Sequence, residues 1–136
     1  MAEGGQFGWY LQIPANYKYS KEHTWLNALD NKEALIGITE FAQSELGEIV
    51  YVDLPLIGKQ FKKNEVFGSV EALKTTSDLF MPVSGEVIEV NPALKDNPTL
   101  VNSASFSEGW MLKIKIFDTS ELASLLDAKG YESLVN

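Results

Sequence analysis

The chain of 136 residues contains no cysteine and no arginine. Without cysteine it has no disulfide framework, no thiolate metal site, no cysteine nucleophile and no thiol redox chemistry from its own side chains. Its 11 basic residues are all lysines, and 19 acidic residues bring the formal net charge to −8. An acidic chain without guanidinium groups is poorly suited to binding nucleic acid. No apolar run approaches the roughly 20 residues that span a bilayer, so we expect no membrane partner.

Side chains suited to catalysis are equally scarce. His23 is the single histidine, and the chain has neither a G-x-S-x-G turn nor a glycine-rich phosphate loop. Its place next to Thr24 and Trp25 favours a structural, partly buried imidazole. The carboxylates have no metal-ligand spacing, so we expect no metal site. The chain is therefore predicted to have no catalytic residues and not to be an enzyme.

The pattern from residue 13 onward is mostly short strands. Residues 1–12 are rich in glycine and aromatic residues without a clear period, and we predict that they form an N-terminal extension outside a single domain at 13–136. Strands are predicted at 34–38, 49–54, 65–71, 79–81, 86–90 and 110–117. Such short strands with glycine and proline turns predict a mostly β fold, either a small barrel or a sandwich.

Two short helices are predicted beside these strands. The first occupies 40–46, with Thr39 as its cap and Gly47 as its end. The second follows Asp118 and Glu121, which resemble a capping box. Its apolar stripe consists of Leu122, Leu125 and Leu126.

Lys74 lies between two similar segments. Each segment places a glycine, Gly68 or Gly85, before an alternating aliphatic and acidic strand. If the segments pair around a short turn, residues 73–76 form an exposed hairpin tip, and the two glycines suit its close turns. The residues alone leave two alternatives open, a pair of merely similar strands and an unmodified, solvated turn lysine.

Ordered motifs spread over residues 13–134 resemble the glycine cleavage H-protein family, whose members are lipoyl carriers. The motifs are YSKEH at 19–23, Trp25, GITEFAQ at 37–43, LGEIVYVDLP at 46–55, Gly58, GSVEALKTTSD at 68–78, PVSGEV at 82–87, LVN at 100–102, GW at 109–110, LLD at 125–127 and Tyr131. The resemblance implies a lipoyl/biotinyl-type barrel-sandwich hybrid with short peripheral and C-terminal helices.

The same resemblance implies lipoate in amide linkage on Lys74, attached by a lipoate-attaching enzyme. The arm would take an aminomethyl group from the pyridoxal-phosphate glycine decarboxylase. It would pass the carbon to tetrahydrofolate on the aminomethyltransferase and be reoxidised by dihydrolipoyl dehydrogenase. The chain would thus be a monomeric, non-catalytic carrier in glycine catabolism and one-carbon metabolism. We expect it in a bacterial cytoplasm, with a processed mitochondrial matrix protein as the alternative.

Acidic groups are implied to shelter the loaded, cationic end of the arm. Asp78 provides one of them, whereas Thr24 stands where the family usually has glutamate, and a hydroxyl cannot pair charge. Glu22 could replace that carboxylate if it shares a regular strand with Thr24. Glu71 and Ser77 flank the lysine segment and complete the predicted set.

Four other functions compete with the glycine cleavage carrier. A biotin carrier would have methionines at the positions of Leu73 and Thr75, and a 2-oxoacid dehydrogenase lipoyl domain usually has Asp-Lys-Ala at the tip. The third alternative is an acidic interaction module with unmodified Lys74. The fourth is a donor in lipoate relay, which the sequence does not separate from glycine cleavage.

Overall fold

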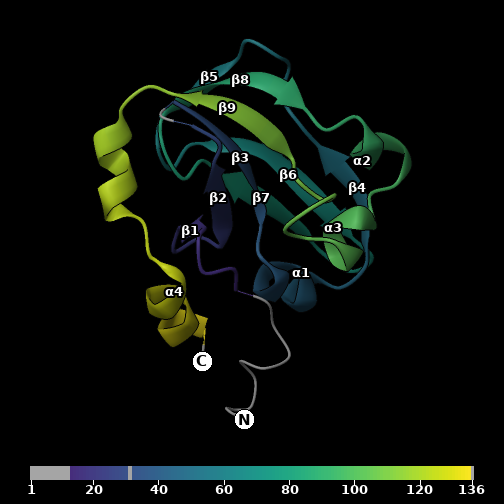
Figure 1. Ribbon diagram of the computed structural model, residues 1–136. Helices are drawn as coiled ribbons and strands as arrows, with labels where there is room; N and C mark the ends of the chain where they lie inside the picture. Colours follow the sequence, from purple (N-terminus) through teal and green to yellow (C-terminus); the bar gives the residue numbers. More distant parts are fainter. Residues whose placement is uncertain (1–12, 31, 136) are drawn as a thin grey trace.

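The computed structural model describes residues 13–30 and 32–135, and these form two antiparallel sheets with short helices around them (Figure 1). The predicted extension at 1–12 lies outside the described residues. The six-stranded sheet contains, in spatial order, β1 (Lys18–Tyr19), β2 (Thr24–Ala28), β3 (Glu33–Ile38), β9 (Leu112–Ile116), β8 (Gly85–Val90) and β5 (Gln60–Phe61). The three-stranded sheet contains β4 (Ile49–Asp53), β6 (Val66–Ala72) and β7 (Thr76–Phe80). The helices are α1 (Glu40–Leu46), α2 (Ala93–Asp96), α3 (Leu100–Ser103), a 3-10 helix (Thr119–Ser124) and α4 (Ala128–Val135).

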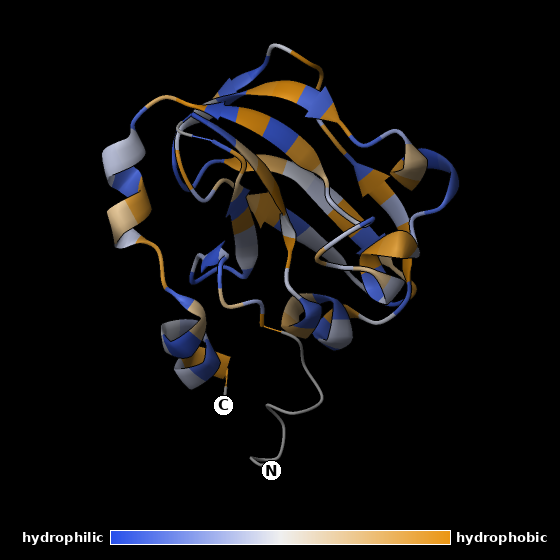
Figure 2. Cartoon of the chain, in the orientation of Figure 1, coloured by the Kyte–Doolittle hydropathy of each residue, from blue (hydrophilic) through white to orange (hydrophobic). Residues whose placement is uncertain are grey.

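The core lies between the two sheets. Leu26 and Ile36 of the six-stranded sheet belong to the same buried cluster as Val52 and Val70 of the three-stranded sheet. Apolar and charged residues alternate along β9, as Figure 2 shows by its alternating colours. Because successive side chains of a strand point to opposite faces, this alternation places one face of β9 in the core and the other outside.

Several predicted elements are confirmed. Helix α1 has the predicted bounds, with the Thr39 hydroxyl accepting from the main-chain N–H of Ala42 and Gly47 ending the helix at φ 85°. The strands predicted at 34–38, 49–54, 65–71, 86–90 and 110–117 correspond to β3, β4, β6, β8 and β9 with shifts of one or two residues at their ends. The strand predicted at 79–81 is wrong in extent, because β7 runs from Thr76 to Phe80.

The predicted leucine-striped C-terminal helix is wrong. A 3-10 helix ends at Ser124, and Leu126 is extended and exchanges main-chain hydrogen bonds with Tyr19. Asp118 caps the 3-10 helix as predicted, with its carboxylate accepting from the Ser120 N–H. The capping box is incomplete because the Glu121 carboxylate accepts from the N–H and hydroxyl of Ser84 instead. The C-terminal helix is α4, which lies beside β1 (Figure 1).

Gly68 and Gly85 do not form turns, contrary to the prediction. Both lie in strands, and neither has a positive φ. A Cβ atom on Gly68 would collide with the Asp53 carbonyl oxygen, and one on Gly85 would lie 2.7 Å from the Lys115 carbonyl oxygen. These glycines are therefore explained by the close approach of a neighbouring strand.

Candidate functional site

Lys74 lies at the tip of the hairpin formed by β6 and β7. The main-chain N–H of Ala72 donates to the Thr75 carbonyl at 2.8 Å, so only Leu73 and Lys74 span the turn. Both side chains are exposed, and Leu73 is 72% accessible. The exposed tip is confirmed for residues 73–75, whereas Thr76 already belongs to β7. The predicted pairing of the two similar segments is wrong, because β6 pairs with β7, and β8 lies in the other sheet.

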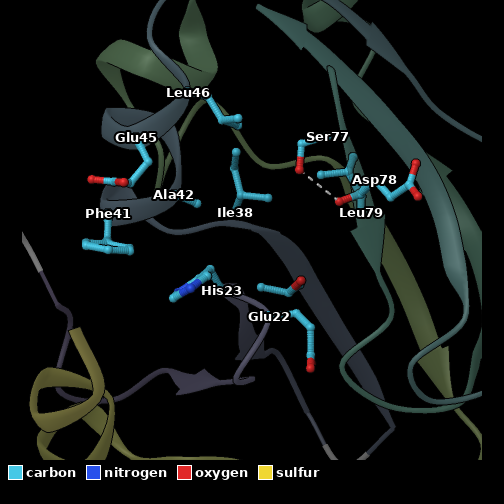
Figure 3. Close-up of a pocket in the computed structure, with 11 residues that line it drawn as sticks. Glu22, His23, Ile38, Phe41, Ala42, Glu45, Leu46, Ser77, Asp78 and Leu79 are labelled. Carbon is cyan, nitrogen blue, oxygen red and sulfur yellow. Dashed lines mark hydrogen bonds between the residues drawn. The ribbon is translucent and has the colours of Figure 1, made fainter. Parts of the chain in front are cut away.

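A pocket of about 270 Å³ lies beside the hairpin, between α1, β7 and the start of β2 (Figure 3). Its walls combine apolar side chains with three carboxyl-bearing residues and the only histidine. The lining residues are Glu22, His23, Thr24, Ile38, Phe41, Ala42, Glu45, Leu46, Ser77, Asp78 and Leu79.

Four of the predicted sheltering residues meet at this pocket. Glu22, Thr24, Ser77 and Asp78 all line it, although the first two are far from the last two in sequence. Glu71 does not line it. Glu71 is exposed between buried Val70 and Ala72, so it lies on the opposite, outer face of the three-stranded sheet.

Thr24 has a structural role in the wall of the pocket. Its side chain is 1% exposed, and its hydroxyl donates to the Phe80 carbonyl oxygen at 2.8 Å. This hydrogen bond joins the start of β2 to the end of β7. A glutamate carboxylate at this position could not donate such a bond, which gives a reason for threonine here.

The Asp78 carboxylate does not point into the pocket. In Figure 3 it is directed away from Ile38 and His23. Asp78 also lines a groove on the outer face together with Ser69, its partner on β6. Asp78 therefore faces the pocket with its main chain, and the acidic groups on the other wall are Glu22 and Glu45.

His23 connects the pocket to the C-terminal helix. Its Nδ1 lies 2.7 Å from the Tyr131 hydroxyl, which lies 2.6 Å from the Thr39 hydroxyl. Tyr131 is fully buried and belongs to α4. The backbone of His23 has a φ of 72°, so Glu22 and Thr24 do not share a regular strand. The predicted structural, partly buried imidazole is confirmed.

Sequence reasoning did not identify Phe41 and Glu45 as site residues. Phe41 lies 5.0 Å from the His23 ring, centroid to centroid. The two residues are four apart in α1, so they share one face of the helix. That spacing, on a helix predicted with the right bounds, is the signal that could have indicated them.

Comparison with known proteins identifies the family. The family model described as glycine cleavage H-protein matches residues 17–136. The chain belongs to the glycine cleavage H-protein family. A glycine cleavage system H protein from Bacteroides fragilis is 49% identical over 93% of this chain and 99% of the relative, and one from Chlorobium limicola is 51% identical over 92% and 98%. The crystal structure of an H protein from Mycobacterium marinum matches with a TM-score of 0.82 and 33% identity, covering 89% of this chain and 97% of that one.

Membership of the H-protein family confirms three predictions from the sequence. The fold is the lipoyl-type barrel-sandwich, the function is that of a lipoyl carrier in glycine cleavage, and the chain is a carrier subunit that catalyses no step itself. Within the described ranges no helix is both long and apolar enough to cross a membrane. The same residues contain no group of three or more histidine, aspartate or glutamate side chains placed to hold a metal ion.

Burial controls the ionisation of His23 in the pocket wall and of Tyr131, whose hydroxyl lies against the His23 ring. Burial lowers the pKa of His23, and the nearby Glu22 and Glu45 carboxylates oppose that lowering. Burial also raises the pKa of Tyr131 to about 12, although its hydrogen bond with Thr39 acts in the opposite direction. The His23 ring is therefore held in its neutral form more strongly than in the unfolded chain.

We predict that the free energy of unfolding decreases as the pH falls below about 6.5, the pKa of histidine in an unfolded chain. The folded protein has the lower His23 pKa, so the unfolded state binds more protons in this range and protonation favours unfolding. Urea unfolding between pH 8 and pH 5.5 measures the effect. His23→Asn is the control, because asparagine tolerates a positive φ and does not titrate. If the free energy of unfolding changes with pH in the same way for both proteins, His23 is not the cause of the pH dependence.

Proposed function

We propose that Lys74 carries lipoate in amide linkage and that the pocket beside the hairpin shelters the loaded end of the arm. One observation carries the proposal: a lysine stands on a two-residue turn, and a partly apolar pocket lies along the strand that follows it. A rigid hairpin fixes the anchor of a flexible arm. Acylation removes the ammonium charge, so the arm can rest against apolar surface without burying a lysine cation.

The reach of the arm matches the place of the pocket. About 11 bonds, each advancing the chain by about 1.25 Å, give an extended lipoyl-lysine roughly 14 Å from Cα to the dithiolane. Asp78 is four residues beyond Lys74, and at about 3.3 Å per residue its main chain lies about 13 Å along β7. The dithiolane end of an arm laid along β7 would therefore arrive where Ser77, Asp78 and Leu79 line the pocket.

The lining of the pocket suits a group with an apolar stem and a cationic end. Ile38, Leu46 and Leu79 supply apolar walls. Glu22 and Glu45 line the pocket, and both stand close enough to His23 to oppose the lowering of its pKa by burial. These two carboxylates take the role that the sequence assigned to Asp78 and to the missing glutamate at Thr24.

The proposed partners are glycine decarboxylase, the aminomethyltransferase, dihydrolipoyl dehydrogenase and a lipoate-attaching enzyme. The names of the relatives support this set, since they place those proteins in the glycine cleavage system. The bacterial origin of these relatives supports a role in a bacterial cytoplasm. The formal charge of −8 favours docking on basic partner surfaces.

A reconstituted glycine cleavage system tests the proposal. Purified decarboxylase, aminomethyltransferase and dihydrolipoyl dehydrogenase should release carbon dioxide from glycine when the lipoylated chain is added, and not when the unmodified chain is added. Equal activity with both forms would contradict the proposal. A lipoylated chain that fails here but donates lipoate to another apoprotein would identify it as a relay donor.

We predict that Glu45→Gln and Glu22→Gln each speed the loss of the aminomethyl group from the loaded arm. Each removes one exposed carboxylate, and exposed charge pairs of this kind correspond to rate changes of about two- to fivefold. Release of ammonia from the isolated loaded protein measures the rate. Glu48→Gln is the matched control, because Glu48 is an exposed carboxylate that does not line the pocket. Equal rates in all three variants would show that the pocket carboxylates do not shelter the arm.

A further inference from the structure

We propose that the lipoyl-lysine arm docks along the outer edge of β7, with its amide carbonyl accepting a hydrogen bond from the main-chain N–H of Thr76. The inference rests on the proposed attachment of lipoate to Lys74 and adds how the chain holds the arm. Main-chain groups would then position the arm, and such groups cannot be identified from the residue types in the sequence.

The outer edge of β7 has no strand beside it in the described part of the chain. The three-stranded sheet has the order β4-β6-β7, so β7 pairs with β6 on one side only. Its opposite side borders the pocket, and the side chains of Thr76 and Asp78 are exposed. Main-chain groups along such an edge are available to a further hydrogen-bonding partner.

The register of the hairpin determines which residues of β7 present their main chain to that edge. Ala72 donates to the Thr75 carbonyl, and Met81 donates to the Glu65 carbonyl, both at 2.8 Å. Residues of an antiparallel pair alternate between hydrogen-bonded and non-hydrogen-bonded positions. Thr75 and Met81 bond toward β6, so the N–H and C=O groups of Thr76, Asp78 and Phe80 point away from it.

Two side-chain contacts agree with this alternation. The Phe80 carbonyl, predicted to point outward, accepts the Thr24 hydroxyl from β2 at 2.8 Å. Asp78 lines the pocket although its carboxylate points away, which is consistent with an outward main chain (Figure 3). The Asp78 carbonyl accepts the Ser77 hydroxyl at 3.3 Å.

The spacing of groups in the arm matches the spacing of this edge. The arm has one amide, with one N–H and one C=O, about six bonds or roughly 7 Å from the Lys74 Cα. Thr76 is two residues along β7, which is about 6.6 Å at 3.3 Å per residue. Because a trans amide points its N–H and C=O in opposite directions, only one of them can face β7, and the C=O can accept from the outward N–H of Thr76 while the dithiolane reaches the level of Asp78 and the pocket.

Amide hydrogen exchange tests the docking directly. The chain is labelled with nitrogen-15, lipoylated enzymatically, checked by intact mass and compared with the unmodified chain. We expect the Thr76 N–H to exchange at least about fivefold more slowly after lipoylation, as a newly bonded amide does, with the Ser77 N–H unchanged because it bonds to β6 in both forms. Failure of lipoate to attach would overturn the proposed function and the docking together. Attachment with Thr76 exchange unchanged would overturn the docking alone.

A proline variant provides a second measurement. Thr76→Pro removes only an N–H that points outward, and proline is tolerated on such an edge. We expect it to lose the aminomethyl group from the loaded arm about three- to tenfold faster, a change typical of one lost hydrogen bond. Thr76→Ala keeps the N–H and should match the wild type. If unfolding curves show that both variants fold and both lose the aminomethyl group at the same rate, the docking is contradicted. It is also contradicted if the Thr76 N–H is protected from exchange only when a partner protein is added.

Discussion

Replacing Lys74 with arginine should stop lipoate attachment and reduce reconstituted glycine cleavage to the level measured without the carrier. Arginine keeps the positive charge and the length of the side chain, but its guanidinium stays protonated and offers no amine to acylate. The hairpin should be unaffected, because Lys74 is exposed. Intact mass after incubation with the lipoate-attaching enzyme, followed by the glycine cleavage assay, measures both effects.

Lys95→Arg is the matched control for this experiment. Lys95 is also an exposed lysine, but it lies in α2 and lines neither the pocket nor the groove described above. The Lys95→Arg protein should be lipoylated on Lys74 and should support glycine cleavage as well as the wild type does. A Lys74→Arg protein that still supports glycine cleavage would show that the carrier group is attached elsewhere. The chain has no cysteine, so its own side chains could not supply the reactive sulfur.

Gly68→Ala should destabilise the protein by about 2–3 kcal/mol, since overpacking against a rigid neighbour costs that much. The added Cβ would collide with the carbonyl oxygen of Asp53 on β4, and no side-chain rotation relieves a clash with backbone. β4 must move away from the strand that leads to Lys74. Urea unfolding at neutral pH, with the midpoint and slope compared to wild type, measures the loss.

Ser69→Ala is the control for Gly68→Ala, because Ser69 is the next residue of β6 and is only partly buried. We expect its free energy of unfolding to stay within about 0.5 kcal/mol of the wild type. A Gly68→Ala protein as stable as Ser69→Ala would show that β4 and β6 can separate at little cost. The close approach would then not explain the glycine.

Local patterns predicted the parts of the fold that local physics determines. The cap at Thr39 and the end at Gly47 determine α1, and the alternation of leucine, lysine and isoleucine determines β9. The leucine pattern near the C-terminus predicted a helix that does not form, because the structure of that segment depends on contacts with distant residues. Glu121 bonds to Ser84, and Leu126 pairs with Tyr19.

Part of the candidate site was also predictable from local sequence, and part depends on contacts between distant residues. Lys74 was indicated by motif resemblance, and its exposed position agrees with the predicted tip. The strand that returns from the turn is β7 and not the similar segment in β8. The pocket was not predictable as a whole, because its walls are joined by the hydrogen bond from Thr24 to Phe80, 56 residues apart. Nor does the sequence reveal that Asp78 turns its carboxylate to the outer face or that His23 adopts a positive φ.

The absence of cysteine has a consequence for a lipoyl carrier. Thiolates attack disulfides, so a thiol on the chain could exchange with the dithiolane of its own arm. With no thiol in its 136 residues, the chain cannot undergo that exchange. Its redox chemistry would then belong entirely to the attached cofactor.

We propose that Lys74 is the residue that carries lipoate. Intact mass and peptide mass spectrometry of the protein purified from its native host test it most directly. The expected result is a single lipoyl adduct on the peptide that contains Lys74, with the other ten lysines unmodified. A chain with no adduct, an adduct of the size of biotin, or lipoate on a different lysine would contradict the claim.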